Sequence, residues 1–208
     1  IAHAPLRDAT VTFPQGMTVN ASSADGLSGC SEVDVRLGSA DPASCPPASK
    51  LGTVEIETPL LEDPLQGSVY LATKGTNPLK SLIALYISVA DPVTGIVLKI
   101  PGKVSPDPIT GQLTASFNDA PQLPFSEFRM RLKGGNRAAL VNPQACGTYT
   151  TQAELAGWAN PAEPAGTPSS FTIDRGCSNG GFKPGFEAGT DDPIAGKSSP
   201  FTLRVTRQ

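Results

Sequence analysis

Proline and glycine recur so often along this chain that they leave room only for short secondary-structure elements. The 208 residues include 21 Gly and 21 Pro. Proline breaks helices because it lacks a backbone donor and clashes with the preceding turn, and glycine weakens them entropically. The apolar residues still come in patterned runs, so the chain is not a disordered one. We therefore predict many short elements joined by turns.

Alternation of apolar and polar residues identifies most of these elements as β-strands. In residues 6–13, Ala9, Val11 and Phe13 fall on one face, and Asp and Thr residues fall on the other. Further strands are expected over residues 53–57, 68–73, 81–90, 96–100, 112–117, 125–133, 148–155, 170–173 and 201–206. Residues 30–37 are expected to form one short helical segment capped by Ser31.

Short strands separated by turn signals are typical of a sandwich or barrel. We predict an all-β fold with little helix, an antiparallel β-sandwich of immunoglobulin-like or jelly-roll-like type, formed by residues 1–208 as a single module. A smaller β subdomain over residues 142–208 is the open alternative. Pairing of residues 6–13 with residues 201–206 in one sheet is a further guess.

Two five-residue segments nearly repeat, DPVTG at residues 91–95 and DPITG at residues 107–111. Both lie where a connection between two expected strands is needed. Asp can accept backbone N–H bonds, Pro presets φ for a type I turn, and Gly adopts the left-handed conformation that closes a bulged hairpin. A calcium loop would need several acidic oxygens at alternating positions, and each segment has one carboxylate. We predict two hairpin turns rather than cation-binding loops.

Four cysteines fall in two local pairs, each in a stretch rich in Pro, Gly and Ser. Zinc is a poor fit, because no Cys-x-x-Cys occurs and the single histidine is His3. We predict the disulfides Cys30–Cys45 and Cys146–Cys177, each contributing roughly 3 kcal/mol in the loop-entropy model. Disulfides imply an oxidising compartment, which favours an extracellular or cell-surface location. Four reduced cysteines in a cytosolic protein are the alternative.

Charge and hydropathy argue against some partners. The chain has 16 basic and 19 acidic residues and no Lys/Arg-rich run, so no nucleic-acid partner is expected. The longest apolar run, residues 82–90, falls well short of the ~20 residues of a membrane helix, so no membrane span is expected. The chain begins at Ile1 rather than Met, and we expect it to be a processed piece of a longer protein.

No catalytic constellation is visible, so we predict that the chain is not an enzyme. Nucleophilic catalysis through histidine would depend on His3, close to a terminus. Paired carboxylates are harder to exclude, because a glycosidase needs only two acids across a cleft. Glu55, Glu57, Glu62 and Asp63 are candidates, although solvated strand faces and turns explain them more simply.

Two places are candidates for ligand binding. Trp158 lies beside a Pro-rich loop and could contribute an aromatic face to carbohydrate binding. Asp191 and Asp192, with Glu187 nearby, form the best candidate for an oxygen-ligand cation such as Ca²⁺. An irregular loop is the simpler interpretation of the acidic residues, and no other cofactor is expected.

Several ordered motifs, spread over nearly the whole chain, together resemble a known class of module. They are SCPPASKLGTVEIETPL, LQGSVYLA, PQLPFSEFRMRLKGG, NPQACGTYTT and the ending SSPFTLRVTR. These segments are similar to modules of very large secreted or surface proteins from actinobacteria. The resemblance implies an extracellular β-rich module, and it brings no activity or catalytic residues.

We therefore expect a non-catalytic structural or adhesion-type module of a secreted or cell-surface protein. Its expected partners are neighbouring modules of the same parent chain. A carbohydrate- or cell-wall-binding module that uses Trp158 to contact a surface glycan is the first alternative. A glycan-active enzyme with paired carboxylates is the second.

Overall fold

The computed structural model describes residues 5–177 and 184–207, and these residues divide between two compact units. Unit 1 comprises Ile1–Pro143 and Thr148–Thr172, and unit 2 comprises Gln144–Gly147 and Ile173–Gln208. The segment from residue 142 onward, expected as one subdomain, is thus shared between the two units.

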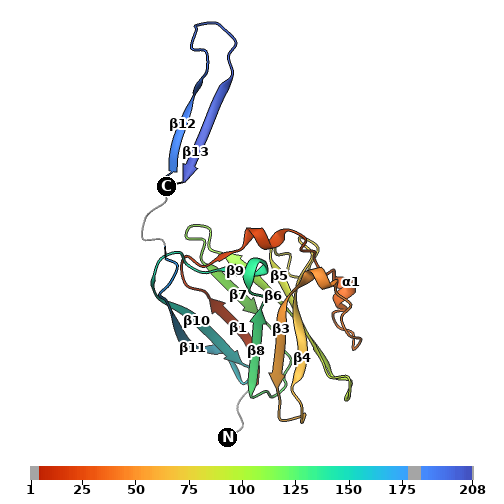
Figure 1. Ribbon diagram of the computed structural model, residues 1–208. Helices are drawn as coiled ribbons and strands as arrows, with labels where there is room; N and C mark the ends of the chain where they lie inside the picture. Colours follow the sequence, from red (N-terminus) through yellow and green to blue (C-terminus); the bar gives the residue numbers. More distant parts are fainter. Residues whose placement is uncertain (1–4, 178–183, 208) are drawn as a thin grey trace. The chain divides into compact units, whose positions relative to one another are not determined.

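Unit 1 is built on one nine-stranded sheet (Figure 1). Its strands are β1 Leu6–Thr12, β3 Lys50–Glu57, β4 Leu65–Leu71, β5 Ala84–Ala90, β6 Val97–Pro106, β7 Leu113–Phe117, β8 Glu127–Leu132, β10 Gly147–Gly157 and β11 Asn160–Ile173. Their spatial order is β11-β10-β1-β7-β6-β5-β4-β3-β8. Strands β3 to β7 form antiparallel pairs between sequence neighbours, and β8 returns to pair with β3. Strand β1 lies inside the sheet, antiparallel to both β7 and β10.

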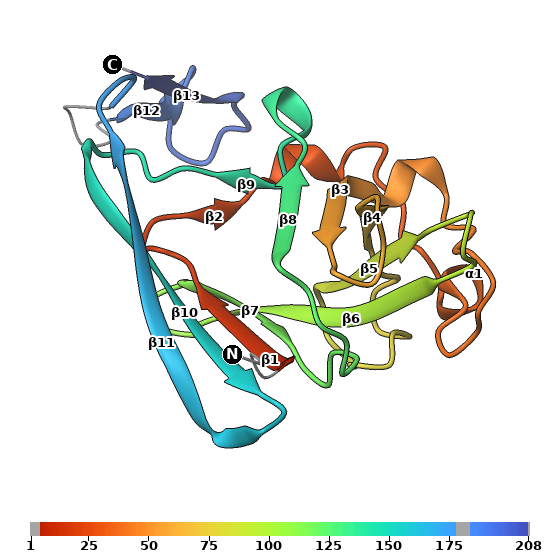
Figure 2. The same ribbon diagram turned by 90° about the horizontal axis from the view of Figure 1, so that it is seen from below.

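The nine-stranded sheet is strongly curled, as an end-on view shows (Figure 2). Right-handed twist accumulates from strand to strand, and open sheets of this size curl or split into layers. The two edge strands of the sheet are β8 and β11, and the short strands β2 (Thr18–Val19) and β9 (Leu140–Val141) are drawn between them in Figure 2. These two short strands form a separate two-stranded sheet.

The core of unit 1 is centred on β5, which is buried on both faces. One face carries Leu85, Ile87 and Val89, which belong to the same cluster as Val54 and Val69. The other face packs Ala84 and Tyr86 beneath the segment that begins at Cys30. Burial of each large apolar side chain stabilises the fold by about 1.5–3 kcal/mol. A strand covered on both sides needs apolar residues at every position, which explains the nearly continuous apolar run at residues 82–90.

A small helical corner covers this second face of β5. Helix α1 spans Glu32–Val35, and the Ser31 hydroxyl oxygen accepts a hydrogen bond from the Asp34 amide at 3.1 Å. The Cys30–Cys45 disulfide closes the corner with a Cα–Cα distance of 5.0 Å. The remaining helical elements are the 3₁₀ turns Ala21–Ala24, Pro47–Ser49 and Gly135–Arg137. The expected short helix with its Ser31 cap and the first expected disulfide are confirmed.

Unit 2 contains a β-hairpin and the second disulfide. Strand β12, Pro184–Thr190, pairs antiparallel with β13, Phe201–Arg207. Cys146 and Cys177 are bonded with a Cα–Cα distance of 5.3 Å, which confirms the second expected pairing. The apolar side chains of the hairpin alternate onto one face, and Phe186, Leu203 and Val205 are more than half exposed.

The all-β, antiparallel, disulfide-stapled fold class is confirmed, and its two facing layers belong to one curled sheet. The guess that residues 6–13 pair with residues 201–206 is wrong, because β1 is occupied by β7 and β10 and β13 pairs with β12. Strand β11 begins at Asn160, ten residues before the expected strand at 170–173. Among the described residues, no helix is long and apolar enough to cross a membrane.

Candidate functional site

A large hollow of unit 1 is lined by residues of β1, of the β3–β4 loop, of the approach to β8 and of the β10–β11 hairpin, and we call it the seam cleft. Its volume is about 1080 Å³. The lining residues are Pro5, Leu6, Glu57, Thr58, Pro59, Leu61, Glu62, Asp63, Pro64, Pro124, Phe125, Ser126, Leu155, Gly157, Ala159, Asn160, Glu163 and Ala165.

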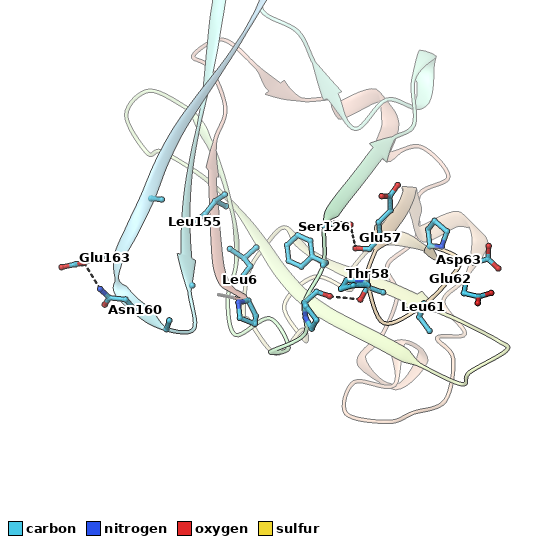
Figure 3. A pocket seen from close by; sticks show the side chains of 18 residues that line it. Leu6, Glu57, Thr58, Leu61, Glu62, Asp63, Ser126, Leu155, Asn160 and Glu163 are labelled. Atoms are coloured by element: carbon cyan, nitrogen blue, oxygen red, sulfur yellow. Dashed lines mark hydrogen bonds between the residues drawn. The ribbon is translucent and has the colours of Figure 1, made fainter. Parts of the chain in front are cut away.

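The walls of the seam cleft are largely apolar. Leu6 and Leu155 lie on one wall, opposite Thr58 and Ser126 (Figure 3). Phe125 also lines the cleft, and its side chain is 40% exposed. A half-exposed ring and leucine side chains in a concavity make a surface from which an apolar ligand could displace water.

Hydrogen bonds hold the β3–β4 loop against the approach to β8. The Thr58 hydroxyl donates to the Pro124 carbonyl oxygen at 2.8 Å and accepts from the Leu60 amide at 3.2 Å. The Ser126 amide donates to the Glu57 carbonyl oxygen at 2.8 Å. The wall of the seam cleft on the β8 side is therefore fixed by backbone-directed bonds.

Carboxylates stand at the rim of the seam cleft. Glu62 and Asp63 point outward on the β3–β4 side, and Glu163 points outward on the opposite side (Figure 3). Glu163 accepts a hydrogen bond from the Asn160 side-chain amide at 2.7 Å. All four carboxylates, including Glu57, belong to exposed residues, and no Lys, Arg or His is among the described residues that line the cleft.

Glu55, one of the four acids considered for a catalytic pair, does not line the seam cleft. Its carboxylate is ion-paired with Arg129 at 2.9 Å and accepts a bond from the Gln66 side-chain amide at 3.1 Å. Glu57, Glu62 and Asp63 line the seam cleft, but in Figure 3 Glu62 and Asp63 point away from its centre. His3, the other catalytic candidate, lies outside the described residues.

Trp158 is next to the seam cleft but does not line it. Its indole N–H donates to the Ala120 carbonyl oxygen at 3.0 Å, and its backbone amide donates to the Pro5 carbonyl oxygen at 2.9 Å. The Arg7 guanidinium carbon lies 5.2 Å from the ring centroid, which is within cation–π range. The half-buried ring thus fastens the β10–β11 turn to the rest of unit 1.

The three carboxylates proposed for calcium do not converge in unit 2. Asp191 accepts from the Thr202 hydroxyl at 3.2 Å, Asp192 pairs with Lys197, and Glu187 pairs with Arg204. Within residues 5–177 and 184–207, no group of three or more His, Cys, Asp or Glu side chains is placed to hold a metal ion.

The DPVTG and DPITG segments are hairpin turns, as predicted. The Asp91 carboxylate accepts from the Thr94 hydroxyl at 2.5 Å and from the amides of Val93 and Thr94. Gly95 closes the turn with φ of 74° and donates its amide to the Asp91 carbonyl oxygen. The side-chain bond from Thr94, followed by the backbone bonds, lowers the pKa of Asp91. The loop's own donors therefore occupy the carboxylate.

The second turn repeats this geometry. The Asp107 carboxylate accepts from the amides of Ile109 and Thr110 at 3.0 and 2.7 Å and from the Thr110 hydroxyl at 2.8 Å. These bonds, led by the Thr110 amide, lower the pKa of Asp107.

One structural contact has no sequence signal at all. The Lys99 ammonium donates to the carbonyl oxygens of Arg36, Ser39 and Asp41 at 2.6, 2.9 and 2.6 Å. It thereby holds the loop between α1 and Cys45 against β6. Desolvation is the main cause that lowers the pKa of Lys99.

The sequence also gives no indication of the seam cleft. Its Pro-rich segments near residues 59–64, 121–124 and 161–164 read as unrelated loops, and only the topology brings them to one end of the sheet. Comparisons with protein-family models, with curated proteins and with solved structures returned no match to the chain.

Proposed function

We propose that this chain is a non-catalytic structural, adhesion-type module of a secreted or cell-surface protein, and that its nine-stranded sheet transmits tension along its strands. One observation carries the proposal: the chain enters the sheet of unit 1 in β1 and leaves it in β11, at opposite ends of the sheet, with β10 between the two strands. Its two disulfides fit an oxidising, extracellular compartment. The likeness to modules of actinobacterial surface proteins agrees with this role.

The directions of β1, β10 and β11 show that the chain enters and leaves the sheet at opposite ends. Leu6, at the start of β1, is paired with Gly157, and Thr12 is paired with Gln152. The hydroxyl oxygens of Thr148 and Thr172 lie 3.4 Å apart. The end of β11 therefore lies beyond the Thr12 end of β1, whereas the chain enters at the Leu6 end.

This geometry makes tension act as shear on the central strands. Hydrogen bonds of an antiparallel ladder are perpendicular to the strands. When strands are pulled lengthwise past each other, all bonds of the ladder are strained together. When strands are peeled from one end, the bonds break one pair at a time. Strand β1 has a ladder on each side, with β7 and with β10, and both resist its sliding.

Trp158 supports the structural role more than the glycan-binding alternative. A carbohydrate-binding aromatic needs a free face and usually a free polar edge. Here the indole N–H is bonded to Ala120, and the ring lies against Arg7.

Single-molecule pulling tests the proposal. One tether joins the two chain ends and loads β1 in shear. A second tether joins the N-terminus to position 159, which follows β10 at the Leu6 end, and therefore peels β1 from β10. We expect a clearly higher unfolding force for the first tether at equal loading rate. Equal forces in the two geometries would refute the mechanical role.

A further inference from the structure

Strand β8 is an edge of the sheet in unit 1, and it keeps all its backbone donors. It pairs with β3 on one side, and in the described part of the chain no strand covers its outer side. The other edge strand, β11, contains Pro161, Pro164 and Pro168, which have no backbone N–H, whereas every residue of β8 has one. No residue of β8 lines the seam cleft. An uncovered edge with intact donors can accept a further strand.

The pairing with β3 shows which backbone groups of β8 point outward. Lys133, the residue after β8, donates its amide to the Leu51 carbonyl oxygen at 2.8 Å. In an antiparallel ladder, hydrogen-bonded and non-bonded positions alternate, so every second residue counted back from Lys133 bonds to β3. The residues between them turn their N–H and C=O groups outward, and they are Phe128, Met130 and Leu132. Among the described residues, no hydrogen bond reaches these outward groups.

One end of the polar face of β8 carries an excess of acid. The guanidinium of Arg129 is ion-paired with Glu55 at 2.9 Å and also with Glu127. Glu57 of β3 lies opposite Glu127 and is exposed. Three carboxylates therefore share one cation at the beginning of β8, and an acidic ligand would be repelled there.

The other end of the same face carries two cations without a partner. Arg131 follows Arg129 on this face, and Lys133 comes two residues later. Both are exposed, and neither forms an ion pair within residues 5–177 and 184–207. Acidic side chains on a neighbouring strand would be attracted to this end of β8.

The opposite face of β8 is apolar and partly open to solvent. Phe128 and Leu132 are 40% and 37% exposed, and Met130 between them packs against the core of unit 1. Apolar side chains on an added strand would cover the two exposed residues and displace water from them. The edge is therefore complementary to a strand that alternates apolar residues with polar ones, of which the residues near Arg131 are acidic.

We propose that β8 binds an extended segment of another protein, with alternating apolar and acidic residues, as an additional antiparallel strand. Directly opposite residues of an antiparallel pair lie on the same face. The apolar residues of the segment therefore lie opposite Phe128, Met130 and Leu132, and their own N–H groups bond to β8. Its acidic residues lie in its N-terminal half, opposite Arg131 and Lys133. The binding does not depend on the mechanical role and survives if that role fails.

A short peptide with blocked ends tests the inference. The peptide EVEVQVK is about one strand long, and in antiparallel pairing its residues lie opposite positions 133 to 127 in that order. The control peptide KVQVEVE has the same composition in reverse order and places its acids at the Glu127 end. Binding to the oxidised full chain is followed by amide NMR. We expect EVEVQVK to shift the amides of β8 and not those of β11, and KVQVEVE to bind at least about tenfold more weakly.

Two methylated forms of the first peptide test the backbone pairing. N-methyl groups on its valines remove the donors that face β8, whereas N-methyl groups on its glutamates and glutamine leave those donors intact. The first form should bind at least about tenfold more weakly than EVEVQVK, and the second should retain most of the binding.

Two matched charge reversals locate the binding. Arg131→Glu reverses an unpaired cation of β8, and Lys103→Glu reverses an exposed, unpaired cation of β6, from which β3, β4 and β5 separate β8. Arg131→Glu should weaken the binding of EVEVQVK at least about tenfold, and Lys103→Glu should leave it unchanged. Equal melting temperatures of the two variants exclude a folding defect.

Four results would overturn the inference. They are no shift of the β8 amides with EVEVQVK, equal binding of KVQVEVE, undiminished binding of the valine-methylated peptide, and undiminished binding to the Arg131→Glu variant. Shifts of the β8 amides on simple dilution of the chain, with a concentration-dependent dimer, would assign the edge to a second copy of this chain instead.

Discussion

The residues whose structure is most easily predicted from the sequence are those that form hydrogen bonds within a single turn. In both DPxTG segments, each residue type has a local task that the sequence states directly: Asp accepts, Pro sets φ, Thr donates and Gly takes the left-handed conformation. Val93 and Ile109 have no such task, and they are 91% and 92% exposed at the turns. Lys99 shows the opposite case, because its three carbonyl partners lie about sixty residues earlier in the chain.

The two turn carboxylates predict how stability responds to acid. Their pKa values are lowered from 3.8 in the folded state. A carboxyl with a depressed folded pKa stabilises the fold above its unfolded pKa, and that contribution is lost as pH falls from about 4 through the folded value. Asp91→Asn combined with Asp107→Asn should flatten this part of the stability–pH curve, measured by urea unfolding. A curve that stays as steep as that of the unaltered chain would contradict the assignment.

At the scale of elements, strands with alternating or continuous apolar residues were predictable, and strands without such a pattern were not. Strand β5 is buried on both faces, and its apolar run marks it in the sequence. The first half of β11 is fully exposed and contains prolines, glycine and alanines, so it lacks the alternation that identifies a strand. Strand β12 was missed for the same reason, and with it the true partner of β13. Prediction of the seam cleft would require the complete strand order, which the apolar–polar pattern of the sequence alone does not provide.

Close approach between strands leaves no free space for a side chain at one glycine of β6. Gly102 is paired with Phe117 of β7, and the Phe117 ring occupies the space where a Cβ atom at position 102 would stand. Gly102→Val should therefore lower the free energy of unfolding by about 1–3 kcal/mol, the usual cost of overpacking. The control is Gly166→Val in β11, where nothing lies within 4 Å of an added Cβ. Chemical denaturation of both variants provides the comparison, and equal losses would be inconsistent with this packing.

At the scale of the whole molecule, the disulfides limit how far the chain can be stretched. They enclose sequence separations of 15 and 31 residues and replace each loop with a span of 5.0 or 5.3 Å. The second bridge joins Cys146, immediately before β10, to Cys177, after β11. While this bridge is intact, pulling on the two chain ends cannot extend the backbone of the long β10–β11 hairpin.

Reduction of both disulfides should allow the residues that they enclose to extend when the chain is pulled. At about 3.5 Å per extended residue, full unfolding of the reduced chain should be about 150 Å longer than that of the oxidised chain. Pulling experiments with and without reductant measure this difference. Replacement of Cys146 and Cys177 by Ser should yield about two thirds of it without reductant, in proportion to the enclosed residues. Identical lengths in both redox states would show that the bridges are not formed.

The prolines of β11 also limit what happens when many copies are crowded together. Growth of an open-ended fibre by edge pairing requires each copy to offer two competent edges, one for the copy before it and one for the copy after it. Here β8 has all its backbone donors and β11 lacks donors at Pro164 and Pro168. Among the two edges of this nine-stranded sheet, only β8 can then join a neighbouring copy, and an assembly through this sheet stops at a pair. Unequal edges thus keep a sheet that can accept a strand from becoming a template for polymerisation.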